Sequence, residues 1–254
     1  MKISYHPIGY TTEDKLVAVR DIAQDVAEAL DDELVARLWR NRILEELCWR
    51  RHLFKNETLP TRPLKWRAPT WSWASTNGKV WVSNTSKFHG CCEHKQIWVE
   101  LVDLDIKTKP SGELVHGHAS MRIRCKLIPA SIKQSDMKGN ILRRDLTFAN
   151  TKQNLSIALE RGGAYTTITV DVPDDTDEQP RNVHLIIIQR CPHEGPYNDD
   201  EDDKHDCAEG LLLVPHHKNR NVFERLGYFY VRDDHVESVV QPHEAAESSI
   251  ITLV

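Results

Sequence analysis

Apolar residues recur every three or four positions up to Cys48, and this is the period of an amphipathic helix. One apolar stripe covers residues 16–30 and a second covers residues 34–48. Glu13 and Asp14 precede the first stripe, where the helix dipole favours negative charge. The pattern therefore predicts two consecutive helices. Five arginines are interpreted as a solvated helix face, with a phosphate site as the less favoured alternative: Arg37, Arg40, Arg42, Arg50 and Arg51.

Beyond residue 96 the period changes to two, which is the period of a β-strand. Met121 and Ile123 point to one face of such a strand, while Arg122 and Arg124 point to the other. Residues 183–189 are apolar on both faces, as expected of a central strand. Further strands are expected at residues 97–102, 155–160, 164–172, 210–215, 225–231 and 249–254.

Glycine pairs and polar runs separate these segments. The dipeptide Asn77-Gly78 is a two-residue turn signal, and it predicts a β-hairpin between residues 71–75 and 79–82. The dipeptide Gly162-Gly163 predicts a second hairpin between the strands on either side of it. Residues 132–153 are polar and weakly patterned, so we interpret them as a loop or an insertion.

Together these elements predict an α+β fold. An N-terminal helical pair would be followed by a mostly antiparallel, sandwich-like β-sheet region. Two units are expected, a helical segment at residues 1–58 and a β-rich domain with a tryptophan-rich hairpin at residues 59–254.

Composition and charge exclude several classes of protein. The net charge of −5 and the pI of about 6.2 give no electrostatic reason to expect a nucleic-acid partner. The acidic stretches at residues 171–178 and 199–206 are interpreted as solvated loops. No apolar run reaches the roughly 18 residues that a membrane span needs, and the N-terminus has no signal-peptide core. We therefore expect a cytoplasmic protein, with its 6 cysteines reduced.

Residues 66–75 contain three tryptophans within eight positions, between the helical and the strand-like parts. In an extended segment Trp71 and Trp73 would share one face. We interpret the run as a structural tryptophan cluster, with an aromatic ligand platform as the alternative. Ser72 is not expected to be a nucleophile, because no Gly-x-Ser-x-Gly turn surrounds it.

This run resembles the RAPSWSWAS signature of fungal heterokaryon-incompatibility (HET) domain proteins. The residues that carry the resemblance are Trp66, Arg67, Ala68, Pro69, Trp71, Ser72, Trp73, Ala74 and Ser75. Residues 14–23 and 32–49 resemble the segments that precede this signature in the same proteins. The resemblance is weaker at residues 210–213 and 225–229, and at the final strand.

The resemblance implies a non-catalytic regulatory or interaction region. HET proteins act in fungal non-self recognition, where incompatible fusion triggers programmed cell death. Most of the HET domain itself would lie upstream of residue 1, so no activity housed there is carried over. The resemblance therefore favours a protein partner, no cofactor and no enzymatic activity.

A second hypothesis is a metal- or thiol-dependent enzyme. Its candidate residues are Cys191, His193, His205 and Cys207, since thiolate and imidazole suit tetrahedral zinc. The spacing within each pair is one residue, which is tighter than the two to four that are usual in zinc sites. We therefore favour an ordinary loop here and expect no bound metal.

Overall fold

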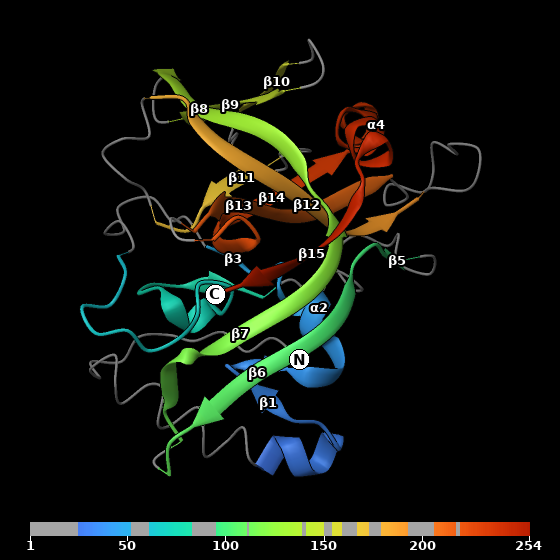
Figure 1. Cartoon of the computed structure of the whole chain (residues 1–254). Helices are drawn as coiled ribbons and strands as arrows, with labels where there is room; N and C mark the ends of the chain where they lie inside the picture. Colours follow the sequence, from blue (N-terminus) through green and yellow to red (C-terminus); the bar gives the residue numbers. More distant parts are fainter. Residues whose placement is uncertain are drawn as a thin grey trace, which may run out of the picture.

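The computed structural model is built mainly from β-strands (Figure 1). It describes residues 25–51, 61–82, 95–110, 112–138, 141–149, 154–158, 167–172, 179–192, 206–216 and 219–254. The N-terminal part consists of β1 (Leu34–Val35), β2 (Leu38–Trp39), η1 (Arg40–Arg42), α2 (Ile43–Glu46) and β3 (Arg50–Arg51). The tryptophan signature contributes η2 (Trp73–Ser75) and is followed by β4 (Val80–Trp81).

One sheet of 11 strands forms the body of the described structure. Its first members are β5 (Gln96–Ile97), β6 (Glu100–Thr108), β7 (Leu114–Lys126), β8 (Ile128–Lys138), β9 (Ile141–Phe148) and β10 (Asn154–Ala158). The others are β11 (Thr167–Val170), β12 (Arg181–Cys191), β13 (Cys207–Pro215), β14 (Val222–Arg232) and β15 (Ser248–Leu253). The main order is β10-β9-β8-β12-β13-β14-β15-β7-β6, with β11 beside β14 and β5 beside β12.

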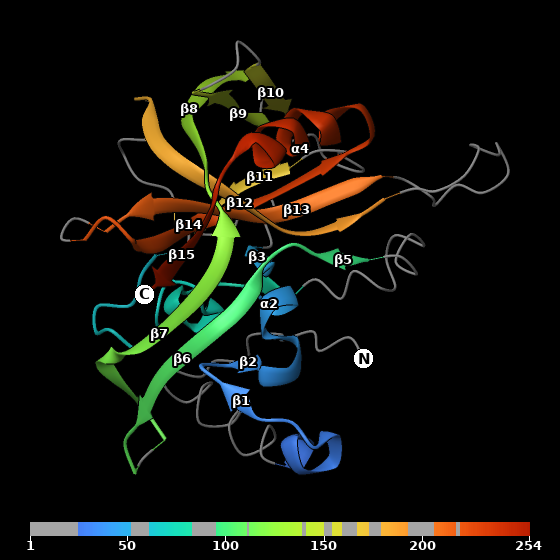
Figure 2. The ribbon, with the colours of Figure 1, turned by 45° about the vertical axis from the view of Figure 1, so that its right-hand side comes forward.

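The path through this sheet closes on itself. Only Leu127 separates β7 from β8, and Figures 1 and 2 show the two as one long bent ribbon. Because β8 pairs with β12 and β7 pairs with β15, the sequence β8-β12-β13-β14-β15-β7 forms a ring. The pairing of β14 with β15 is parallel, and the helix α4 (Val236–Ala245) makes the crossover between them.

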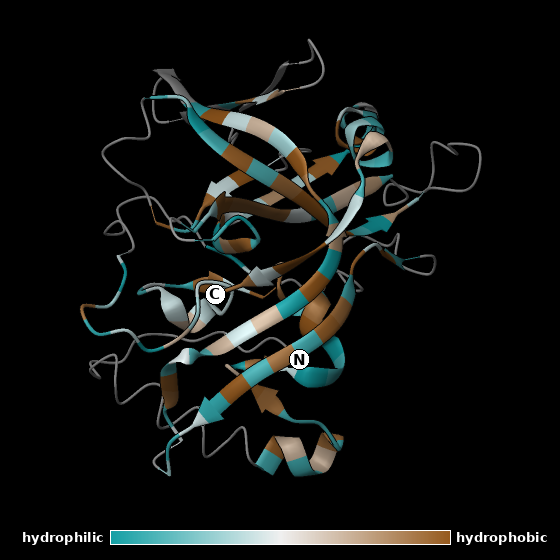
Figure 3. Cartoon of the chain, viewed as in Figure 1, coloured by the Kyte–Doolittle hydropathy of each residue, from teal (hydrophilic) through white to brown (hydrophobic). Residues whose placement is uncertain are grey.

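The ring separates two hydrophobic cores. Along β12, Ile186 and Ile188 join one core while Leu185 and Ile187 join the other, which confirms the expectation of a central strand covered on both faces. Strand β7 confirms the half-buried pattern, since its buried residues alternate with exposed arginines. Figure 3 shows the same alternation of hydropathy along β6 and β7.

The predicted N-terminal helical pair is wrong. Residues 25–30 are helical, and the start of that predicted helix lies outside the described residues. The second helix is replaced by the hairpin β1–β2, a 3-10 turn and the single helical turn α2. The apolar stripe at residues 34–48 is nevertheless buried, and it forms part of the core beneath β7 and β14. The periodicity of residues 34–48 therefore predicted correctly that they are buried, but it predicted a helix where the chain forms a hairpin and short turns.

Positive backbone angles explain this error. Ala36 has φ +47° and Arg37 has φ +74°, and these two residues connect β1 to β2. A two-residue connection with both φ values positive is the type I′ turn, which twists in the same sense as its strands. Alanine and arginine do not signal a type I′ turn in the sequence, because asparagine and glycine are the usual residues at its two positive-φ positions.

Two further expectations differ from the structure, and one helix was not expected. Residues 132–153 contain the end of β8 and all of β9, so they are not a loop. The strands on either side of Gly162-Gly163 do not pair with each other, because β10 pairs with β9 and β11 pairs with β14. Helix α4, which contains Pro242, was not among the expected elements. The final strand β15 does pair into the sheet as expected.

The prediction of a tryptophan-rich hairpin is also wrong. Residues 73–75 form the 3-10 turn η2, and β4 pairs with β3 instead of with the signature. The expected α+β class is wrong as well, because most of the described elements are strands. Strands β5 to β15 form one continuous sheet and not a sandwich of two, and β1–β2 and β3–β4 are separate two-stranded sheets.

The turn at Arg37 allows a direct test. A left-handed residue other than glycine carries roughly 1 kcal/mol of strain, which glycine avoids. We therefore expect Arg37→Gly to be more stable than Arg37→Ala by about 1 kcal/mol in urea unfolding. Both variants remove the same side chain, so the difference isolates the backbone. Equal stability, or a more stable alanine variant, would contradict the turn.

Candidate functional site

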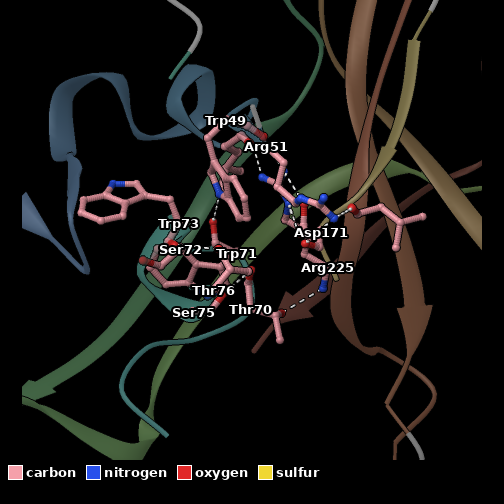
Figure 4. A network of polar contacts seen from close by, with 12 residues as sticks. Trp49, Arg51, Thr70, Trp71, Ser72, Trp73, Ser75, Thr76, Asp171 and Arg225 are labelled. Carbon is pink, nitrogen blue, oxygen red and sulfur yellow. Dashed lines mark hydrogen bonds and ion pairs between the residues drawn. The ribbon is translucent and has the colours of Figure 1, made fainter. Parts of the chain in front are cut away.

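The tryptophan signature folds into a tight turn that is held by its own side chains (Figure 4). Ser72 caps η2, because its hydroxyl accepts a hydrogen bond from the backbone N–H of Ala74 at 3.1 Å. Trp71 and Ser72 are fully buried. The two indoles do not share a face as predicted, since Trp71 lies in the core while Trp73 is partly exposed. The buried ring of Trp71 offers no accessible face to a ligand.

The signature holds the strained β1–β2 turn. The hydroxyl of Ser72 donates to the carbonyl of Ala36 at 2.6 Å, and the indole N–H of Trp73 donates to the carbonyl of Arg37 at 2.8 Å. Both acceptors belong to the residues with positive φ. Two side chains of the signature therefore stabilise the turn that the local sequence does not favour.

The signature also binds the N-terminal part to the sheet. The indole N–H of Trp49 donates to the carbonyl of Trp71 at 2.8 Å. The hydroxyl of Thr70 accepts from the backbone N–H of Arg225 at 2.9 Å and donates to the main-chain oxygen of Val254. One threonine hydroxyl thus joins β14 to the segment that follows β15.

Two arginines brace the loop that leads into the signature. Arg67 donates to the carbonyls of Ala74 and Thr76, the latter at 2.6 Å. Arg62 donates to the hydroxyl of Ser75 at 2.6 Å and to the carbonyl of Arg225 at 3.4 Å. The loop between these arginines is therefore held at both ends.

Leu64 and Trp66 lie on this braced loop and face solvent. Leu64 is fully exposed, and Trp66 is 38% exposed with its ring edge against His116 at a centroid distance of 4.7 Å. Trp66 is thus the signature tryptophan with the most accessible ring, whereas Ala68, Ala74 and Ser75 are buried.

Arg225 is the centre of the polar network beneath the signature (Figure 4). Its side chain and that of Asp171 are both 0% exposed, and two hydrogen bonds of 2.8 and 3.1 Å join them. The guanidinium also donates to the carbonyls of Leu47 and Trp49. Its central carbon lies 3.5 Å from the centroid of the Trp49 ring. All three guanidinium nitrogens therefore have acceptors from outside β14.

The close approach of β11 to β14 places Asp171 beside Arg225. Val170 is the register partner of Gly227, and the N–H of Asp171 donates to the carbonyl of Leu226 at 2.8 Å. A side chain at position 227 would put its Cβ 2.2 Å from the carbonyl oxygen of Thr169. Glycine is therefore required there for the two strands to meet.

The interpretation of the acidic and arginine-rich stretches as solvated missed this site. Asp171 opens an acidic stretch but is buried, and Arg51 is also buried and donates to the carbonyls of Val170 and Asp171. Burial raises the pKa of the Asp171 carboxyl and lowers the pKa of the Arg225 guanidinium, and the contact between the two groups opposes both shifts. The sequence signal for this site was Arg225, a charged residue in the apolar strand expected at residues 225–231.

A second buried network lies on strands β12 to β14. Tyr228 donates its hydroxyl proton to Glu209 at 2.5 Å, and the amide of Gln189 donates to the other carboxyl oxygen. Burial raises the pKa of the Glu209 carboxyl. Both oxygens of the Glu209 carboxyl accept hydrogen bonds from neighbouring strands, so this group links β12, β13 and β14.

The candidate metal residues are partly placed. Cys191 and Cys207 are register partners at the end of the β12–β13 ladder, and both are in the thiol form. His193 and His205 lie outside the described residues. Across the described ranges, no three His, Cys, Asp or Glu side chains come together as a metal site.

A shallow hollow of about 430 Å³ lies beside the β1–β2 hairpin. It is lined by Ala27, Glu28, Asp31, Asp32, Glu33, Arg40 and Asn41. Arg40 is paired with Glu33 at 2.9 Å across exposed surface, and the carboxylate of Asp32 accepts from the N–H of Asn41. The hollow therefore contains charges that are already paired or solvated.

Comparisons with protein-family models, with curated proteins and with solved structures find no match for this chain. The likeness to HET proteins therefore rests on the signature and its neighbouring segments alone. Within the part of the chain that the structure describes, no helix has the length and apolarity to cross a bilayer.

Glu46 is a third buried acid with a clear structural role. Its carboxylate accepts a hydrogen bond from the backbone N–H of Trp39 at 2.8 Å, and so joins α2 to β2. Arg42 lies 3.5 Å from its other oxygen. Burial raises the pKa of Glu46 from 4.5 to about 7.

Removing the Asp171 charge should destabilise the fold strongly. Asp171→Asn leaves the Arg225 guanidinium buried without its counter-charge, and we expect a loss of about 3–5 kcal/mol in urea unfolding. The matched control is Glu100→Gln, which breaks the exposed 2.9 Å pair with Arg124 and should change stability by less than about 0.5 kcal/mol.

A double-mutant cycle completes that test. Asp171→Asn combined with Arg225→Met should show a coupling of about 2–3 kcal/mol, since the second change removes the charge that the first leaves unmatched. Additive effects of the two changes would show that the pair does not act as a unit.

Glu46 should make stability depend on pH. Its pKa is higher in the folded chain than in the unfolded chain, so its contribution is fully present below pH 4.5 and is lost as pH rises through about 7. Glu46→Gln keeps an acceptor for Trp39 without the charge. We expect this variant to exceed the wild type by about 1–3 kcal/mol at pH 8 and to match it near pH 4.

Urea unfolding across this pH range measures the effect. Glu46→Ala is the control, because it loses the acceptor as well as the charge and should be less stable than Glu46→Gln at every pH. A difference between Glu46→Gln and wild type that stays constant from pH 4 to pH 8 would rule out the raised pKa.

Proposed function

We propose that this chain is a non-catalytic regulatory or interaction region of a HET-like protein, acting in non-self recognition in the cytoplasm. The observation that carries the proposal is the braced loop before the signature, where Leu64 and Trp66 are exposed on a segment held by Arg62 and Arg67. A rigid exposed tryptophan is typical of the anchor residues of protein interfaces.

The internal chemistry supports a structural use of the buried charged groups. Asp171 and Arg225 are satisfied by each other and by backbone carbonyls, and Glu209 is satisfied by two neighbouring strands. Burial raises the pKa of the Cys48 thiol well above its ordinary value, so this cysteine is a poor nucleophile. These groups hold elements together and leave no free acid, base or thiolate among them.

Rigidity favours the loop as a binding surface. Binding loses less conformational entropy when a loop is already ordered, so exposed apolar side chains on a braced loop give affinity efficiently. The signature would then have two roles. Its buried residues fix the loop, and its first tryptophan contacts the partner together with Leu64.

Cell-death assays in a filamentous fungus can test this function. The wild-type chain, expressed in pairs of fusing incompatible strains, should change the fraction of fusion cells that take up a vital dye. The double variant Leu64→Ser/Trp66→Ser should lose at least about tenfold of that effect, because interface anchors contribute roughly 2 kcal/mol or more. Its Tm should fall by less than about 5 °C, since Leu64 is fully exposed and Trp66 is partly exposed.

The matched control is Leu30→Ser/Val82→Ser, which replaces two exposed apolar residues elsewhere and should behave as wild type. Two results would contradict the proposal. Death caused by the chain alone would make it an effector and not a regulator. An equal effect of the two double variants would remove the loop from the interface.

A metal- or thiol-dependent enzyme is the second candidate, and the adjacency of Cys191 and Cys207 favours it. Metal analysis of protein purified without chelator tests whether zinc binds at these two thiols. Zinc near one equivalent per chain would support the alternative, and zinc well below that amount would exclude a zinc site at these thiols.

A further inference from the structure

Cys191 and Cys207 stand opposite each other across two antiparallel strands. They are the last register pair of the β12–β13 ladder, after Gln189 with Glu209 and Arg190 with Ala208. Directly opposed residues in such a ladder have Cα atoms about 4.5–5.5 Å apart. A disulfide needs Cα atoms about 4.4–6.8 Å apart. The backbone therefore already has the spacing that a bond between these two sulfurs requires.

Neither of the other two described cysteines, Cys48 and Cys125, stands opposite a cysteine in a strand ladder. Cys125 has Ser249 as its register partner, and burial raises the pKa of its thiol to about 12. Cys48 lies in the turn after α2 and is fully buried. Cys191 and Cys207 are 2% and 7% exposed, and they lie at a strand end, where ladders open most readily.

The end of this ladder is connected to helix α4. Arg190 pairs with Asp206 at 2.8 Å and lies 3.6 Å from Glu237 of α4. Its guanidinium also lies 5.7 Å from the ring centroid of Trp98, which stacks on His243 of α4. A covalent bond at the adjacent residue pair would therefore hold a corner that joins β12, β13 and α4.

We propose that Cys191 and Cys207 form a reversible disulfide by exchange with a low-molecular-weight disulfide such as glutathione disulfide. The thiolate of Cys207, the more exposed residue, attacks one sulfur of glutathione disulfide and releases one glutathione thiolate. The thiolate of Cys191 then attacks the Cys207 sulfur of the mixed disulfide and releases the second.

The two electrons lost by the protein thiols reduce the glutathione disulfide, and their two protons pass to the glutathione thiolates. This modification goes beyond the proposed interface function and does not depend on it. It makes the corner beside α4 responsive to the thiol–disulfide balance of its surroundings.

The bond closes a loop of 15 residues, 192–206. Closing a loop of that length restricts the unfolded chain, and the Tm should rise by roughly 5–10 °C on oxidation and fall back on reduction with dithiothreitol.

Peptide mapping of the full chain tests the proposal. The folded protein is incubated with glutathione buffers of increasing oxidised fraction, alkylated and digested with trypsin. Cleavage after Arg190, Lys204 and Lys218 gives peptides 191–204 and 205–218, each with one cysteine of the pair. We expect these two peptides to be cross-linked, and the cross-link to disappear after reduction. Mapping distinguishes this bond from any bond to the other cysteines.

Single variants test the order of attack without requiring the bond. In Cys191→Ser, glutathione should accumulate on Cys207 at least about threefold faster than it does on Cys191 in Cys207→Ser. The proposal is overturned if peptides 191–204 and 205–218 stay separate up to fully oxidised glutathione. It is equally overturned if they cross-link only after unfolding in urea, or if the cross-linked chain melts no higher than the reduced chain.

Discussion

The rest of the structure depends on the burial of one arginine. Arg225 carries its charge on a side chain that is 0% exposed, and a buried charge is tolerated only when it is paired and hydrogen-bonded. Its partners come from Asp171 after β11 and from the carbonyls of Leu47 and Trp49 in the N-terminal part. These segments are far apart in the sequence. They must meet at one point because the guanidinium has no solvent to replace them.

The tryptophan signature completes this arrangement from the other side. Trp49 stacks on the guanidinium and donates to the carbonyl of Trp71, and Thr70 accepts from the backbone N–H of Arg225. Ser72 and Trp73 of the signature donate to backbone carbonyls, which fixes the path of the chain as well as the position of side chains. The signature therefore acts as a structural connection between the β1–β2 turn and the sheet. Its braced entry loop follows from that rigidity, and so does the interface that we propose.

The closed path of strands explains why the connection is needed. β7 and β8 form one bent strand that belongs to both ends of the ring, so each face of β12 covers a different core. The N-terminal residues fill one of these cores together with Trp71 and residues of β7, β13 and β14. Without the arginine network, the short elements β1, β2 and α2 would have little to hold them there, because elements of this length are marginal alone.

The sequence by itself determined many of the buried apolar positions. The alternation in β7, the two apolar faces of β12 and the apolar stripe at residues 34–48 all appear in the two cores, because regularly spaced apolar side chains favour burial. The tryptophan signature could also be selected from sequence as a structural cluster. Tertiary structure decided the rest. Ala36 and Arg37 adopt positive φ because Ser72 and Trp73 bind their carbonyls, and Asp171 is buried because Gly227 lets β11 approach Arg225. These are contacts between distant segments, and local periodicity contains no information about them.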